Sequence, residues 1–312
     1  MRIRLLLFSL ALVALFIAAC SDNDPVAPKT NGGAVPFNTS QMPLTVPNTI
    51  VGYSNLGTGP GGNLLVPGMS GELYMIDKTD GTIGLFASYI GAAQGGPYDQ
   101  MCCAYDAAAG RIYTAAVLSN PSRIWYVETS DSSVHLMADL GDNGYITQLL
   151  MVPAGFGAYA NQLLVFTYAG GGAGIVAVNP ATPGAPVPIA AQKCNAAAFG
   201  PDGVLYITDR DNDRVATVSA AGVVADYLTG VSSLEGIVVN QGNDRMYIAR
   251  VGLSGDLDSL YSVTMPGKVV TPLPFEPDLD SGWYPTGLIL DNAGKILFNG
   301  GETSQIIDFY DL

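Results

Sequence analysis

Residues 194–218, CNAAAFGPDGVLYITDRDNDRVATV, contain the pattern that decides the fold. A short apolar run at 195–199 is followed by a turn at 201–203, where Gly supplies the backbone conformation that side chains disfavour. A β-branched and aromatic run at 204–208 comes next, and after a charged loop a third run occupies 215–218. This alternation predicts a meander of short antiparallel strands.

The same unit recurs along the chain, with a spacing of roughly 40–50 residues that is typical of a β-propeller blade. Within the unit, each copy of the second strand is followed by a third strand, and five of the six copies are followed by a fourth, outer strand. The second strand is repeated at 63–66, 111–114, 162–166, 204–207, 245–248 and 295–298. Six copies predict an all-β, six-bladed β-propeller.

The last copy of the unit ends at Leu312 without an outer strand. The apolar segment 42–46, ahead of the first blade, can fill that place and leave no blade with an open edge. The sequence therefore predicts a propeller closed by an N-terminal strand. A stack of two β-sandwiches is the alternative architecture.

The N-terminus resembles the signal of a bacterial lipoprotein. Residues 1–4 carry positive charge, 5–19 are apolar, and Cys20 follows two alanines. The resemblance predicts cleavage before Cys20, lipidation of its thiol and further acylation with chains such as palmitate, which together anchor a protein stably. A cell-envelope location follows, and Ser21 favours the outer membrane in a Gram-negative cell. A single membrane-spanning helix is the alternative.

Composition separates a tether from the folded part and restricts the partners. Residues 20–40 are rich in Asp, Asn, Pro and Gly and resemble a flexible tether, which leaves 41–312 for the propeller. The chain carries 13 basic and 27 acidic residues, a formal net charge of −14. Nucleic acid is an improbable partner, because phosphate binding needs the opposite sign. The expected partners are the membrane, through the lipid, and a sugar-like molecule or a protein.

The motif GPDGVLYITDRDNDRV resembles an NHL-type blade, and SSLEGIVVNQGNDRMYIAR and YPTGLILDNAGKILFNGG repeat parts of it. The wider pattern is similar to the superfamily of gluconolactonases, senescence marker protein and streptogramin lyase. The resemblance is strong over blades four to six and weak over the first three. It implies the propeller fold but specifies no reaction.

Strand alternation within a blade brings the start of the first strand, the end of the second and the loops between blades to one face. Carboxylates, amides, arginine and aromatic rings are therefore expected to converge at one mouth of the central channel. The expected innermost positions are Gln100 or Met101, Thr147, Asn195, Glu235 and Thr286; Asp209 and Arg250 end second strands; and Tyr98, Asp99, Asp142, Tyr145, Trp283 and Tyr284 lie in loops between blades.

In gluconolactonase-like propellers, a Glu, an Asn and an Asp hold a divalent, calcium-like cation, and hard cations prefer such oxygen ligands. The resemblance implies Glu235 and Asn195 as two of these ligands, whereas Thr286 stands where the Asp is expected. Asp99 or Asp209 is the candidate third ligand. The alternative is that Glu235 and Asn195 are hydrated groups lining the channel and that Asp209 bonds its own turn.

The histidine and cysteine content restricts catalysis. His135, the only histidine, falls in an outer strand, so no histidine-based triad or lyase chemistry is expected at the channel mouth. Cys102, Cys103 and Cys194 fall in innermost strands and are expected to pack as small apolar residues.

The leading hypothesis from the sequence is a lipid-anchored propeller that binds a ligand or partner protein through the aromatic face, without catalysis. The alternative is a divalent-metal-dependent hydrolase or lactonase of the gluconolactonase type. A third possibility is that the blades only hold an assembly together.

Overall fold

The structure is a computed structural model, in which residues 1–37 and 38–312 form two units. It describes residues 44–45, 56–68, 71–77, 82–88, 100–116, 122–141, 144–168, 174–250, 259–273, 288–290, 296–299 and 306–310, all within the second unit. Cys20, the apolar segment before it and the tether lie outside the described residues. Among the described residues, no helix is long and apolar enough to cross a membrane.

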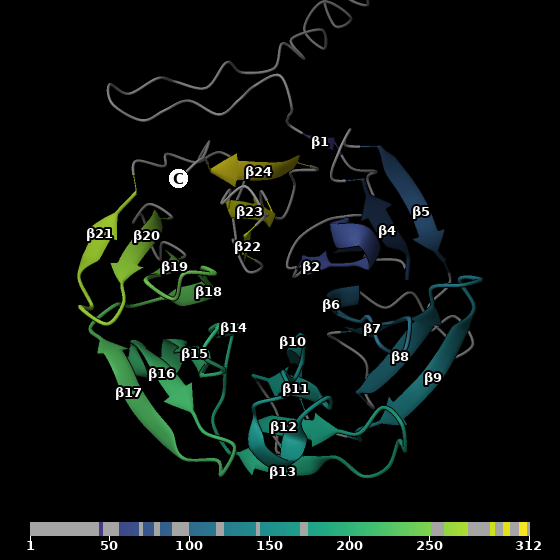
Figure 1. The fold of residues 1–312 in the computed structure, drawn as a ribbon, viewed down its shortest axis with the longest axis horizontal. Coiled ribbons are helices and arrows are strands. Elements are labelled where there is room, and N and C mark those ends of the chain that lie inside the picture. Colours follow the sequence, from purple (N-terminus) through teal and green to yellow (C-terminus); the bar gives the residue numbers. More distant parts are fainter. Residues whose placement is uncertain are drawn as a thin grey trace, which may run out of the picture. The chain divides into compact units, whose positions relative to one another are not determined.

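The described strands form six four-stranded antiparallel sheets, which follow one another around a centre (Figure 1). The first three sheets contain β2 (Gly57–Thr58), β3 (Leu64–Pro67), β4 (Leu73–Ile76) and β5 (Ile83–Ala87); β6 (Gln100–Asp106), β7 (Arg111–Ala116), β8 (Arg123–Glu128) and β9 (Val134–Asp139); and β10 (Ile146–Met151), β11 (Leu163–Thr167), β12 (Ile175–Val178) and β13 (Val187–Ala190).

The next two sheets contain β14 (Ala197–Phe199), β15 (Leu205–Asp209), β16 (Arg214–Val218) and β17 (Val224–Thr229); and β18 (Leu234–Val239), β19 (Arg245–Arg250), β20 (Ser259–Thr264) and β21 (Val270–Pro272). Short 3-10 turns lie at Pro60–Gly62, Gly157–Tyr159 and Arg210–Asn212. The prediction of an all-β propeller is confirmed.

The sixth sheet joins the two ends of the propeller chain. It contains β22 (Ile289–Leu290), β23 (Ile296–Asn299) and β24 (Ile306–Tyr310), and its outer strand is β1 (Leu44–Thr45). β1 pairs with β24 in antiparallel register, with Leu44 opposite Ile307. This is the place in which the sequence put the segment 42–46.

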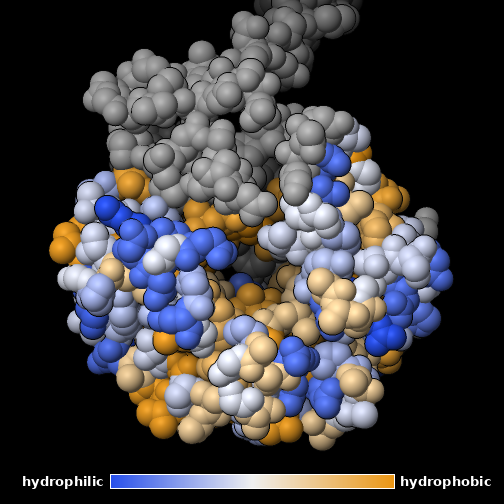
Figure 2. Space-filling view, in the orientation of Figure 1, coloured by the Kyte–Doolittle hydropathy of each residue, from blue (hydrophilic) through white to orange (hydrophobic). Residues whose placement is uncertain are grey.

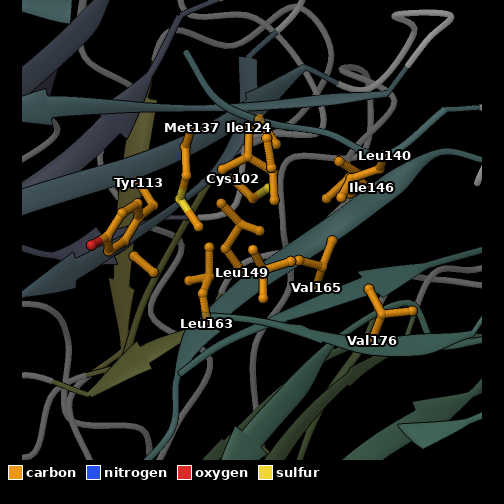
Figure 3. Close-up of a cluster of buried hydrophobic side chains, with 14 residues drawn as sticks. Cys102, Tyr113, Ile124, Met137, Leu140, Ile146, Leu149, Leu163, Val165 and Val176 are labelled. Carbon is orange, nitrogen blue, oxygen red and sulfur yellow. The ribbon is translucent and has the colours of Figure 1, made fainter. Parts of the chain in front are cut away.

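Among the described residues, neighbouring sheets pack face to face, because the apolar side chains of one strand alternate between the two sides of its sheet. The core is therefore a series of clusters between blades. Figure 3 shows the cluster between the β6–β9 and β10–β13 blades, where Cys102, Tyr113 and Ile124 meet Leu149 and Val165.

The cysteines occupy three different clusters between blades. Cys102 packs towards the β10–β13 blade, Cys103 packs towards the β2–β5 blade, and Cys194 lies between the third and fourth described sheets. All three thiols are reduced and buried, and burial raises the pKa of each. Neighbouring cysteines thus face opposite sides of β6, as strand geometry requires.

Two glycines of the β14–β17 blade test how tightly the blades pack. Gly203 and Gly222 both have φ of 79°, in the left-handed region. A Cβ on Gly203 would meet nothing within 4 Å, whereas a Cβ on Gly222 would collide with the carbonyl of Ile189 in the preceding blade.

We therefore expect Gly203→Ala to lower the free energy of unfolding by about 1 kcal/mol, the cost of left-handed backbone alone. Gly222→Ala should cost about 1–3 kcal/mol more, because the backbone of the preceding blade must also move. Chemical denaturation of both variants measures this difference. Equal losses would contradict the close approach of the two blades.

Candidate functional site

Three of the innermost strands have a β-bulge near the end that lies at one mouth of the central channel. The register shifts by one residue between Gln100 and Cys102 in β6, between Ile146 and Gln148 in β10, and between Leu234 and Gly236 in β18. Met101, Thr147 and Glu235 are the extra residues at these bulges. A bulge redirects a side chain that a regular strand would direct into the packing between blades.

Asn195 takes the corresponding place ahead of β14. Its backbone N–H donates to the carbonyl of Thr208 at 3.2 Å, and the N–H of Thr208 donates to the carbonyl of Ala196 at 2.8 Å. The Thr208 hydroxyl also accepts a bond from the Ala196 N–H at 2.8 Å. Thr147, Asn195 and Glu235, which the repeat aligns in the sequence, therefore occupy equivalent positions. Figure 2 shows the hollow that opens between the innermost strands.

Asn195 and Glu235 meet at this mouth, together with Arg210 from the turn after β15. The Asn195 amide donates from Nδ2 to Glu235 Oε2 at 2.8 Å, and Arg210 Nη1 donates to Glu235 Oε1 at 2.5 Å. Glu235 is only 5% exposed. Burial raises the pKa of Glu235, and the Arg210 charge and the two hydrogen bonds counteract that rise. The result is a buried carboxylate with both oxygens engaged.

Asp209 is buried beside this trio but faces a different set of partners. Its carboxylate accepts bonds from Asn212 Nδ2 at 3.0 and 2.8 Å and from Arg214 Nε at 2.7 Å. Arg214 also donates from Nη1 to Asp226 of the outer strand. Its Nη2 donates at 3.0 Å to Gln192 Oε1, in the linker from the preceding blade. Asp209 thus holds the turn between β15 and β16, which is the second of the two roles expected for it.

A divalent cation does not fit this donor set as the side chains stand. Arg210 already supplies a positive charge to Glu235, and Asn195 presents an N–H donor to it. Two unit charges 4 Å apart interact by about 4 kcal/mol at the effective dielectric of a protein surface, and a divalent ion would double that repulsion. Among the described residues, no group of three or more His, Cys, Asp or Glu side chains is arranged to hold a metal ion.

Three further side chains at this mouth were not singled out from the sequence. The hydroxyl of Tyr168, at the end of β11, donates to Asp211 Oδ1 at 2.9 Å, and Lys193 Nζ lies 3.6 Å from Asp211 Oδ2. Lys193 also lies 5.7 Å from the centre of the Tyr168 ring. Burial raises the pKa of Tyr168, and the hydrogen bond to Asp211 raises it further. The sequence contains one signal for them, which is that Tyr168 and Asp211 follow second strands and Lys193 precedes a first strand. Their mutual contacts could not be predicted, because they form between two separate blades.

The other expected site residues divide into described and undescribed ones. Tyr145 is 46% exposed and precedes β10, where its carbonyl accepts a bond from the Tyr168 N–H at 3.0 Å. Arg250 ends β19 opposite Leu234 and Ser259. The remaining candidates lie outside the described residues: Tyr98, Asp99, Asp142, Trp283, Tyr284 and Thr286.

His135 lies on the outermost strand β9, away from the innermost strands. It stacks on Tyr126, with ring centres 4.9 Å apart, and shares a 3.0 Å hydrogen bond with Ser133. The only histidine of the chain therefore takes part in an interaction on the outer edge of a blade.

No protein-family model matches the chain, and no curated protein matches its sequence. Many solved structures share the fold. Regucalcin from Agrobacterium tumefaciens, a calcium-binding protein, is 15% identical with a TM-score of 0.59, over 86% of this chain and 92% of that one. Virginiamycin B lyase from Staphylococcus aureus is 13% identical with a TM-score of 0.54, over 87% and 88%.

The PQQ-bound aldose sugar dehydrogenase from Streptomyces coelicolor is 12% identical with a TM-score of 0.59, over 86% of this chain and 96% of that one. At such identities the likeness shows the β-propeller fold alone. These proteins differ in what they bind, so the function of this chain has to be argued from its own site.

The Asp209 network gives a matched pair of variants. Asp209 has a 1% exposed side chain and Asp226 a 58% exposed one, although both pair with Arg214. We expect Asp209→Ala to lower the free energy of unfolding by about 3–5 kcal/mol, since it leaves a partly buried guanidinium without its main partner.

Asp226→Ala should cost less than about 1 kcal/mol, because exposed ion pairs contribute little. Denaturant titration at low and moderate salt measures both losses. A small loss in Asp209→Ala would mean that Asp209 is free for another role.

Proposed function

We propose that this chain is a binding propeller, which takes up a ligand or a partner protein at the channel mouth and does not catalyse a reaction on it. The observation that carries the proposal is the Arg210–Glu235–Asn195 trio, in which each oxygen of Glu235 accepts a bond from one of the other two side chains. A base or nucleophile for catalysis needs a reactive group held ready for substrate. Glu235, the carboxylate of the trio, has both oxygens engaged instead.

The position of His135 supports the same conclusion. The catalytically inactive form of virginiamycin B lyase is one in which a histidine is replaced by alanine. Here the only histidine stacks on Tyr126 at the outer edge of a blade. The metal-dependent hydrolase suggested by the resemblance is disfavoured for the described residues, because Arg210 competes with a cation for Glu235.

The ligand chemistry that fits the mouth is a polar molecule with flat apolar faces, such as a sugar chain or a peptide segment. The half-exposed Tyr145 offers an aromatic ring for stacking. Next to it, Tyr168, Lys193 and Asp211 supply a fixed hydroxyl, an ammonium group and a carboxylate. Such a combination of a rigid ring and oriented polar groups is typical of binding surfaces.

A soluble peptidoglycan fragment, a disaccharide that carries a tetrapeptide, tests this proposal because it presents both chemistries together. We expect calorimetry to show binding, and Tyr145→Ala to weaken it by about fivefold or more, from the loss of a stacking contact of about 1 kcal/mol. Leu136→Ala, which removes a 48% exposed side chain from the outer strand β9, should leave the affinity unchanged.

The absence of any binding by the parent chain would reject this ligand class. Equal weakening by Tyr145→Ala and Leu136→Ala would reject the channel mouth as the site. Trp283→Ala and Tyr284→Ala extend the same test to the expected aromatic face.

We also propose that the propeller is a lipid-anchored cell-envelope protein whose ring of six blades is closed by the N-terminal strand. The lipoprotein-like signal ending at Cys20 supports the anchor. The pairing of β1 with β24 supports the closure, and in the sequence the tether 20–40 precedes β1.

Metabolic labelling with an alkyne analogue of palmitate, in a Gram-negative host, tests the anchor. The parent chain should take up label and sediment with membranes, whereas Cys20→Ala should do neither, because it lacks the thiol that carries the lipid. Cys194→Ala should behave like the parent, since that thiol is buried between blades. Label that persists in Cys20→Ala would refute the anchor at this residue.

A further inference from the structure

The carboxylate of Glu235 is in a position that requires a positive charge. It is 5% exposed at the bulge of β18, and a buried carboxylate without a counter-charge is strongly unfavourable. The chain provides that charge from the turn after β15, where Arg210 Nη1 lies 2.5 Å from Glu235 Oε1. The guanidinium side chain is 31% exposed, so it enters the pair from the solvent side.

We propose that the Arg210 guanidinium occupies, as a fixed part of the chain, the place in which a divalent cation could neutralise Glu235. The mouth is then independent of metal as it stands. It also follows that removal of this single positive charge converts the same residues into a cation site, which goes beyond the binding function proposed above and does not depend on it.

The donor atoms for such a site are already in place around Glu235. The carboxylate contributes two oxygens, and the neighbouring Asn195 contributes an amide whose Oδ1 is buried without a hydrogen-bond partner among the described residues. A half-turn of that amide exchanges its oxygen and nitrogen, which places an oxygen beside Glu235 in place of the donor. Carboxylate and amide oxygens, completed by water, are the ligands that Ca²⁺ prefers.

The turn that carries Arg210 is held independently of this side chain. Asp209 accepts bonds from Asn212 and Arg214, and the N–H of Asp213 donates to the backbone carbonyl of Arg210 at 3.4 Å. Loss of the guanidinium therefore removes a charge from Glu235 without removing the contacts that hold the turn. This makes the position suitable for substitution.

The experiment compares the parent with Arg210→Met, which keeps most of the apolar length without the charge, and Arg210→Lys, which keeps a charge. Thermal unfolding of each metal-free protein is measured without Ca²⁺ and with about 10 mM Ca²⁺. A weak site with a dissociation constant of about 1 mM raises the midpoint by roughly 2–4 °C. We expect that rise in Arg210→Met, and none in the parent or Arg210→Lys.

The double variant Arg210→Met with Glu235→Gln identifies the site, because it should lose the response to Ca²⁺. Calorimetric titration with Ca²⁺ gives a second readout that does not depend on stability. A folded Arg210→Met that shows no response, or a response that survives in the double variant, overturns the proposal.

The unfolding midpoint of the parent protein with Ca²⁺ tests the proposal even if Arg210→Met does not fold. A rise of the parent's midpoint with Ca²⁺ that is abolished by Glu235→Gln would show that a cation enters beside Arg210, which overturns the proposal. No rise in the parent supports it. Peptidoglycan binding can fail without changing either result, so the two proposals fail separately.

Discussion

The fold of this chain depends on apolar packing between the faces of neighbouring blades. Clusters such as that of Cys102, Ile124 and Leu149 occupy the space between neighbouring sheets, and they leave little freedom for polar side chains along the strands. The polar groups of the candidate site lie instead in the turns, at the ends of strands and at the bulges near the start of the innermost strands. The same packing that stabilises the propeller determines where a site can be.

The bulges connect this packing to the site. In a regular strand at the start of β18, successive side chains would point alternately into the clusters on the two sides of the blade. A carboxylate there would be buried among apolar side chains. The extra residue at Glu235, like Thr147 in β10, is free of this alternation. Thr147 uses that freedom to donate to the Cys194 carbonyl of the next blade at 2.9 Å, and Asn195 reaches Glu235 in the same way. Adjacent blades are thus joined at the channel mouth by polar contacts that equivalent residues make to the next blade.

The sequence predicted those parts of the structure that repeat. The strand at 204–207 corresponds to β15, and the alignment of six copies placed Asn195 and Glu235 side by side although 40 positions separate them. It did not predict the partner of Glu235. Arg210 stands in a charged loop whose neighbours Asp209 and Asn212 bond the turn, and nothing in the letters distinguishes an arginine that faces solvent from one that crosses to the next blade. Tyr168 and Lys193 were missed for the same reason, because they meet only when two blades are packed together.

A fixed guanidinium and a bound cation would each neutralise the buried negative charge of Glu235, but they have different consequences for chemistry at the site. A divalent ion has open coordination positions, so it can hold and acidify a water molecule. The guanidinium has no such position, so it orients Glu235 and offers only hydrogen-bond donors. Its planar set of N–H groups suits oxygen atoms of a ligand, and the adjacent Lys193, Asp211 and Tyr168 extend that polar surface. An arrangement of this kind is suited to recognising a ligand without changing it, which is why we propose binding rather than catalysis at this mouth.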